Sequence, residues 1–234
     1  MEQVFKLKYN MNKKLKIGDI FYLKLKDQEK YVFGRVLFDV KKQYQKIVNV
    51  NNLPSDYFPY LKMFYSDCHL VEMYDGVYDN INDFESSSKI IIPRVLTQPV
   101  DSKRNVLEWG IVTNQKVDYT QIEFPENLNL SSNVKFLDRG ELSLRTKITG
   151  NEAENMGYKS NMCVPLTVAN ASLDFQGRRD LIPEDIRRPS YLKDNDLYYN
   201  PELRTKIYTE LNIDPDKSYY ELSKEMGFDL ERFY

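Results

Sequence analysis

The residues best suited to covalent chemistry are two cysteines and a single histidine. Cys68 and His69 are neighbours, and a histidine beside a cysteine can activate a thiolate nucleophile. Their surroundings read as a strand, however, and adjacent strand residues point to opposite faces. One histidine also excludes a metal site built from several histidines. We therefore expect no catalytic residues, and we expect Cys68 and Cys163 to be buried thiols.

An acidic stretch, DGVYDNINDFESSS, follows the predicted strand at residues 69–74. Its carboxylates could chelate a cation, but their order is not that of a calcium loop. The chain also lacks phosphate-loop, dinucleotide-binding, zinc-protease and nucleophile-elbow motifs, and the sequence selects no pair of acids of the glycosidase type. We expect no metal and no cofactor. An Asp-Gly pair after a strand and the lack of a regular period predict a surface loop.

Two arginine pairs invite a phosphate-binding interpretation. Arg178 and Arg179 precede Asp180, and Arg187 with Arg188 follows Glu184 and Asp185. Acids this close repel a phosphate group and can pair with the arginines, so the pattern favours internal ion pairs.

These residues are expected to lie on or between β-strands. The segment KIGDIFYLKLKDQEKYVFGRVLFDV predicts a hairpin, with strands at 19–26 and 31–38 and a bend at Gly34. Further strand candidates are residues 69–74, 89–96, 107–112, 115–124 and 141–148. In the last of these, Leu142, Leu144, Thr146 and Ile148 share one side, which predicts one exposed face.

Helix signals are concentrated at the end of the chain. Asn200 and Pro201 begin one amphipathic helix, and Ser218 with Glu221 forms the capping box of a second that stops at Gly227. We expect an α+β fold: a curved, mainly antiparallel sheet with C-terminal helices packed on it. The predicted division is a β-rich domain at 1–168 and, at 169–234, an irregular connection with two short helices packed on the same domain.

Composition excludes several functional classes. A hydrophobic share of 41% without a long apolar run predicts a water-soluble chain, so no membrane partner is expected. The lysine-rich start lacks the apolar core of a secretion signal, which favours a cytoplasmic location. Basic residues gather at the start and acidic ones later, with a net charge of −2. Lysines that alternate along strands are typical of a solvated sheet face, so a nucleic-acid partner is not expected.

The segment KIGDIFYLKLKDQEKYVFGRVLFD resembles the opening of the immunity protein 26 family of bacterial polymorphic toxin systems, with Gly18, Asp19, Gly34 and Arg35 at the motif positions. LEWGIV, at 107–112, resembles the family's tryptophan-bearing strand, and the segment from 201 to 229 is similar to the helical tail of some immunity proteins. Residues 125–190 have no counterpart in the resemblance.

The resemblance implies a non-enzymatic cytoplasmic protein that binds and blocks a cognate bacterial toxin, and it implies that the four motif residues determine the fold. Nucleases and other toxins that act on nucleic acid are commonly basic, and an acidic loop could occupy their phosphate-binding groove. The acidic loop is therefore our candidate toxin-binding surface. Its proposed residues are Tyr74, Asp75, Tyr78, Asp79, Asp83 and Glu85. The alternative is an RNA-binding SH3-like barrel of toxin–antitoxin type that uses the lysine-rich start.

Overall fold

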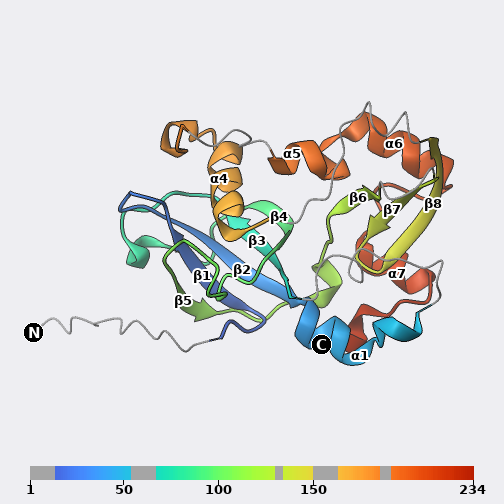
Figure 1. Ribbon diagram of the computed structural model, residues 1–234, viewed down its shortest axis with the longest axis horizontal. Helices are drawn as coiled ribbons and strands as arrows, with labels where there is room; N and C mark the ends of the chain where they lie inside the picture. The colour runs from blue at the N-terminus through green and yellow to red at the C-terminus, as the bar shows by residue number, and fades with distance from the viewer. Residues whose placement is uncertain (1–13, 54–66, 130–133, 150–162, 185–190) are drawn as a thin grey trace, which may run out of the picture.

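The computed structural model describes residues 14–53, 67–129, 134–149, 163–184 and 191–234. Its strands form two antiparallel sheets, one of five strands and one of three, and neither sheet is closed. The helices lie mostly in the C-terminal part (Figure 1). The fold is therefore α+β with antiparallel sheets, as predicted, but the strands are divided between two sheets.

The larger sheet contains the predicted hairpin at its centre. Its strand order is β4-β3-β2-β1-β5, and every neighbouring pair is antiparallel. The five strands are β1 (Asp19–Lys24), β2 (Tyr31–Asp39), β3 (His69–Tyr74), β4 (Ile90–Thr97) and β5 (Trp109–Asn114). The strands predicted at 69–74, 89–96 and 107–112 are thus confirmed, with ends shifted by up to two residues. Residues 115–124 form no strand and contain only a 3₁₀ turn at Tyr119–Gln121.

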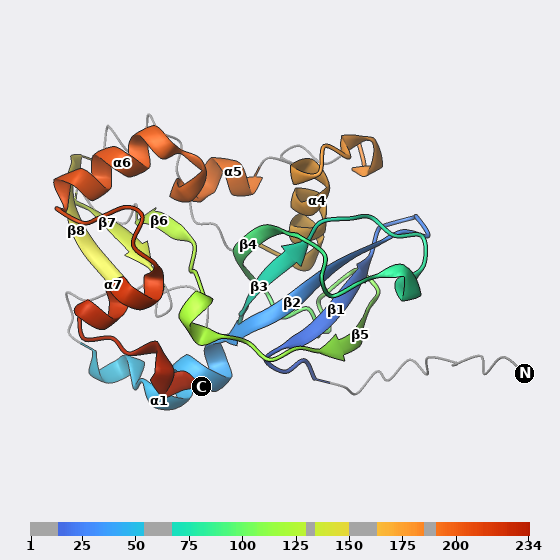
Figure 2. The same ribbon diagram turned by 180° about the vertical axis from the view of Figure 1, so that it is seen from behind.

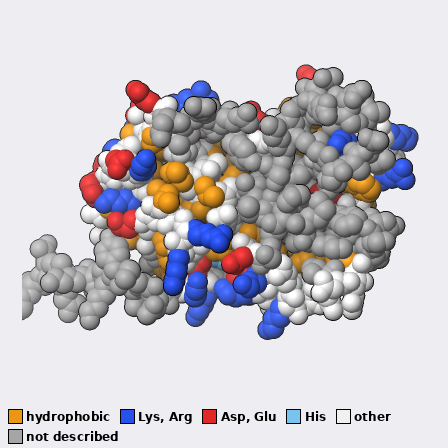
Figure 3. Space-filling model, viewed as in Figure 1, with side chains coloured by type: hydrophobic (Ala, Val, Ile, Leu, Met, Phe, Trp, Pro, Cys, Tyr) orange, Lys and Arg blue, Asp and Glu red, His pale blue; other side chains and the backbone are white. Residues whose placement is uncertain are grey.

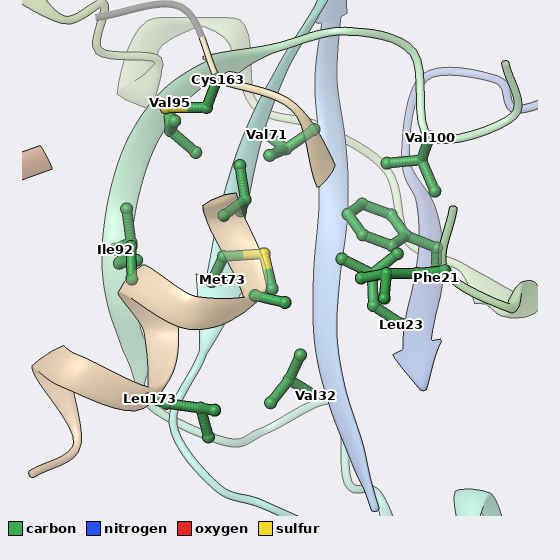
Figure 4. Close-up of a cluster of buried hydrophobic side chains, with 14 of the residues drawn as sticks. Phe21, Leu23, Val32, Val71, Met73, Ile92, Val95, Val100, Cys163 and Leu173 are labelled. Atoms are coloured by element: carbon green, nitrogen blue, oxygen red, sulfur yellow. The ribbon is translucent and has the colours of Figure 1, made fainter. Parts of the chain in front are cut away.

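One face of this sheet packs on α4 (Pro165–Phe175) through an apolar core. Phe21 and Leu23 from β1, Val32 from β2 and Met73 from β3 belong to one core cluster with Leu173 of the helix (Figure 4). The sequence prediction missed α4. Eight of its eleven residues are buried, so the helix has no polar side to reveal a helical period.

The smaller sheet lies beside the first and has the order β6-β7-β8 (Figure 2). Its strands are β6 (Glu126–Asn129), β7 (Val134–Arg139) and β8 (Leu142–Thr149). The prediction placed only β8, whose Arg145 and Lys147 are exposed while Thr146 and Ile148 are buried.

Two predicted helices cover this second sheet, and both are confirmed. They are α6 (Pro201–Glu210) and α7 (Tyr219–Glu225). The Asn200 side chain accepts a hydrogen bond from the N–H of Leu203 at 3.2 Å, and Ser218 and Glu221 form both bonds of the capping box. The remaining short elements are a π-helical turn at Val40–Tyr44, α1 (Gln45–Ile47), α5 (Tyr191–Asn195) and 3₁₀ turns at Val50–Asn52, Ile81–Asp83, Arg179–Leu181, Leu197–Tyr199 and Leu230–Phe233.

The predicted domain boundary after residue 168 falls inside α4, which packs on the larger sheet. The two-domain division itself stays a prediction. In the described ranges, no helix combines the length and apolar character needed to cross a membrane.

Candidate interaction surface

The predicted acidic loop, residues 75–88, covers the face of the larger sheet opposite α4. Apolar side chains beneath the loop form a compact cluster with the sheet. Ile20, Tyr22, Phe33 and Tyr74 are its buried members, and Tyr31, Tyr78, Ile81 and Phe84 pack against them. The loop therefore rests on a packed aromatic base, from which its acids extend.

Ring contacts define the geometry of this base. Phe33 stacks on Phe84 at a centroid distance of 4.2 Å, and Tyr78 meets Phe33 edge-on at 5.1 Å. Tyr74 is only 2% exposed, and its ring lies 5.2 Å from that of Phe84. Burial raises the pKa of Tyr74 to about 12. Of the two proposed tyrosines, Tyr74 thus belongs to the buried base and Tyr78 to its half-buried margin.

Backbone hydrogen bonds fix the start of the loop on three sides. Tyr78 exchanges backbone bonds with Tyr31, at 2.8 and 3.0 Å, and the N–H of Asp75 donates to the carbonyl of Lys89. The N–H of Gly76 donates to the Gln176 side chain just after α4, at 3.1 Å. Gly76 has φ +117°, and a Cβ there would lie 2.7 Å from the Tyr78 ring, so the turn needs glycine.

The four proposed carboxylates differ in their surroundings. Asp75 is half-buried, whereas Asp79, Asp83 and Glu85 are exposed. Asp79 forms an ion pair with Lys30 at 2.6 Å, and its side chain is 80% exposed. Within the parts of the chain that the structure describes, Asp83 and Glu85 form no ion pair. These two acids are therefore the exposed members of the four that have no ion pair in the described ranges; Asp75 also has none there but is half-buried.

Ion pairs from neighbouring segments surround the loop. Lys24 pairs with Glu29 at 2.6 Å in the hairpin, and Arg178 pairs with Asp180 at 3.0 Å. Arg179 reaches Asp174 of α4 at 2.5 Å, so the first arginine pair forms the internal ion pairs that the sequence predicted. The second pair, Arg187 and Arg188, lies outside the described residues.

The cysteine and histidine are positioned as buried structural groups. Burial raises the pKa of Cys68, and it raises that of Cys163 to about 12, so neither thiol is activated as a nucleophile. His69 is 3% exposed, and its Nε2 lies 3.5 Å from Asp39. The described part of the chain contains no group of three or more His, Cys, Asp or Glu residues arranged to hold a metal ion.

No local sequence pattern predicts the charged cluster that lies, among the described residues, where the two sheets meet. Glu126 of β6 accepts two hydrogen bonds from Arg204 of α6, at 2.7 and 2.9 Å, and its side chain has no exposed area. Arg94 of β4 and Arg139 of β7 lie 3.8 and 3.7 Å from the same carboxylate. Glu123 also pairs with both of these arginines. We call these five residues, together with Asp196, the ionic junction.

The Asp196 side chain joins the ionic junction by accepting hydrogen bonds from backbone N–H groups. One carboxylate oxygen accepts hydrogen bonds from the N–H groups of Glu126 and Tyr198, at 3.0 and 3.1 Å. Burial raises the pKa of Asp196 to about 6. The junction members are charged residues scattered between positions 94 and 204, and no local spacing links them. Their side chains pair with one another, so the junction has a structural role rather than that of an open site.

The comparison with protein families matches residues 16–128 to the family model of immunity protein 26. The matched span is just under half of the 234 residues, and it includes the whole five-stranded sheet, the acidic loop and the four motif residues. The comparisons with curated proteins and with solved structures gave no match. This match supports the resemblance of residues 16–128 to the immunity protein 26 family.

Proposed function

We propose that this protein is a non-enzymatic immunity protein of a polymorphic toxin system, which binds and neutralises a cognate bacterial toxin in the cytoplasm. The observation that carries this proposal is the family match across the larger sheet and its acidic loop. The family match implies an immunity protein in general, and the finer assignment is our inference from the surface that this segment displays.

The acidic loop has the properties of a preorganised binding surface. Its backbone is held by the sheet and by Gln176, and its aromatic side chains pack on the sheet, so little conformational entropy is lost on binding. Asp79, Asp83 and Glu85 are exposed above this base. Such an arrangement suits a basic protein surface, because complementary charge speeds association.

We infer that the cognate toxin presents lysines and arginines to this loop, as a nuclease with a phosphate-binding groove would. Asp83 and Glu85 should contribute most, because Asp79 already has a partner in Lys30. Asp75 is half-buried and should contribute less, and the tyrosines act by holding the loop in place.

The experiment uses the toxin domain encoded beside this chain as the titrant in calorimetry. The test variant carries D75N, D79N, D83N and E85Q, and a control variant carries E184Q, E202Q, D216N and E231Q, four exposed acids elsewhere. We expect at least about tenfold weaker binding and a shallower salt dependence for the test variant alone. Equal affinity of both variants would exclude the loop as the contact surface, and the absence of any binding by the wild type would exclude the function.

The alternative, an RNA-binding SH3-like barrel, gains no support. The larger sheet has two open edges, β4 and β5, and the family match is to immunity proteins.

A further inference from the structure

Six cationic side chains surround the segment that leads into β1, at the end of the sheet where β1 begins. They are Lys14, Lys16, Lys42, Lys103, Arg104 and Lys116, all exposed, and we call them the cationic rim. Figure 3 shows lysine and arginine side chains gathered along the lower edge of one face of the molecule, with a few acidic side chains among them.

Contacts between distant segments bring the rim together. Asp101 accepts a hydrogen bond from the N–H of Leu15 at 3.1 Å and pairs with Lys14 at 3.7 Å, which places the loop of Lys103 and Arg104 beside this segment. The Lys42 ammonium donates to the carbonyl of Leu15 at 3.3 Å.

On the opposite side of the segment, the N–H of Gln115 donates to the carbonyl of Gly18 at 2.9 Å. This bond places Lys116 next to the start of β1. The six cations thus come from four stretches of chain that converge on residues 14–18.

Three carboxylates near these cations are buried and accept hydrogen bonds from backbone groups, whereas Asp118, close to Lys116, is exposed. Asp19, Asp39 and Asp101 each accept a main-chain N–H, from Lys16, Lys42 and Leu15 respectively. The side chains of Asp39 and Asp101 are 7% and 5% exposed. These three acids therefore hold the backbone from beneath, while the cations remain at the surface.

Only two of the six cations have a carboxylate partner in the described ranges: Lys14 pairs with Asp101, and Lys42 pairs with Asp39 at 2.7 Å. The other four form no ion pair there. In the acidic loop, by comparison, Asp79 pairs with Lys30. The rim therefore has an excess of positive charge, with Asp118 as an exposed acid close to Lys116.

The rim fits a protein surface better than a nucleic acid. The chain as a whole has a net charge of −2, which opposes a long polyanion, whereas proteins that bind nucleic acid through charge are usually strongly basic. The exposed apolar residues nearest to the rim in sequence are aliphatic: Val106, 75% exposed, and Val112, 38% exposed. Aliphatic side chains suit a protein interface and offer no platform for base stacking.

We propose that the cationic rim docks a carboxylate-rich surface of a protein partner. The partner does not add to β5 as a further strand, because a bulge near Val112 interrupts the regular pairing of that edge. The rim lies at the opposite end of β1 from the acidic loop, and this strand of six residues spans about 20 Å. The two surfaces therefore recognise opposite charges at separate places, and the rim does not depend on the function proposed for the loop.

The test measures binding of the full chain to a poly-L-glutamate peptide of about 20 residues and, separately, to single-stranded DNA of about the same length. The rim variant carries K16Q, K103Q, R104Q and K116Q, which leaves the paired Lys14 and Lys42 intact. The control variant carries K26Q, K89Q, K206Q and K224Q, exposed lysines outside the rim, and therefore has the same net charge. Thermal unfolding checks that both variants fold.

We expect the wild type and the control variant to bind polyglutamate at about 20 mM NaCl, with binding lost near 300 mM. The rim variant should bind at least about tenfold more weakly. Equal weakening in both variants would overturn the proposal, because the loss of affinity would then follow from net charge alone and not from the position of the cations. Absence of polyglutamate binding would also overturn it, and tighter binding of DNA than of polyglutamate would assign the rim to nucleic acid instead.

Discussion

The molecule contains two buried interfaces that differ in composition, one apolar and one charged. Where α4 meets the larger sheet, the side chains are aliphatic and aromatic, with Phe21, Leu23 and Met73 fully buried. Where the two sheets meet, three arginines and three acids lie in or close to the interior. The first interface depends on removal of apolar surface from water, and the second on correct pairing of buried charges.

This difference has consequences for specificity. An apolar interface tolerates small shifts, because dispersion and the hydrophobic effect are not directional. A buried bidentate pair such as Arg204 with Glu126 has a strict geometry, and a shift of one sheet would leave charges unpaired. We infer that the apolar interface supplies most of the stability, while the ionic junction fixes the placement of the smaller sheet.

The largest loss of stability is expected from a substitution in the apolar interface. Phe21→Ala removes a ring with no exposed area and leaves a cavity, so we expect the free energy of unfolding to fall by about 3–5 kcal/mol. Urea denaturation followed by circular dichroism measures the loss. The control, Val106→Ala, truncates a side chain that is 75% exposed and should change stability by about 0.5 kcal/mol or less. Equal values for the two variants would contradict the packing around Phe21.

The second variant breaks the ionic junction at its centre. Glu126→Gln keeps the shape of the side chain but leaves Arg94, Arg139 and Arg204 with one buried negative charge fewer. Removing one partner from a buried ion pair is costly, and we expect a loss of about 3 kcal/mol by the same urea assay. Glu202→Gln, at an exposed position on α6, is the matched control and should be nearly neutral. A loss below about 1 kcal/mol would mean that the junction is not needed to hold the sheets together.

The contrast between the interfaces also explains what the sequence could predict. Alternation identifies β8, and apolar runs between turn residues identify β1, β2 and β3. The half-buried strand expected at 19–26 is wrong in one respect, because β1 is buried on both faces, by α4 and by the acidic loop. Cap residues identify α6 and α7, since Asn200, Ser218 and Glu221 act locally. These signals are short in sequence, and the structure confirms them.

The missed features depend on contacts between distant segments. Helix α4 is buried on most sides, and the junction residues are charged, so neither shows a periodic pattern. Gly34 was expected to bend its strand, yet a Cβ there would lie 2.6 Å from the Met73 sulfur and 2.7 Å from the Phe21 ring. Close packing therefore explains this glycine. The composition of residues 75–88 predicted the acidic loop. Its aromatic base could not be predicted, because it depends on contacts between residues far apart in sequence, such as Phe33 and Tyr78.

A third and smaller effect is a dependence of stability on pH, which is expected from the ionic junction and not from the apolar interface. Because burial raises the pKa of Asp196 to about 6, the folded state holds that proton more tightly than the unfolded state does. The resulting stability is complete below about pH 4 and is lost as pH rises through about 6. Asp196→Asn keeps the oxygen that accepts the two N–H bonds but cannot titrate. We expect the stability of the wild type, measured relative to this variant, to fall by about 2 kcal/mol between pH 4 and 7.

Urea titrations of both proteins at several pH values give that difference, and Phe21→Ala serves as the control. Its stability difference from the wild type should stay constant over the same range, since no titrating group was removed. A pH-independent difference between the wild type and Asp196→Asn would show that Asp196 is not held in the protonated form by burial.

The smallest change in stability is expected at the start of α7, where a local helix cap lies beside the ionic junction. The Ser218 hydroxyl accepts the N–H of Glu221, and the next residue, Tyr219, donates its own N–H to Glu123 of the junction at 3.0 Å. Ser218→Ala removes the cap and should cost about 1 kcal/mol in the urea assay, whereas Thr209→Ala at an exposed position of α6 should be nearly neutral. A cost well above 2 kcal/mol would mean that the cap also holds Glu123 in its pairing geometry, and the boundary of the ionic junction would then include the first turn of α7. A cost near zero would mean that the contacts of Tyr219 alone fix the position of this helix.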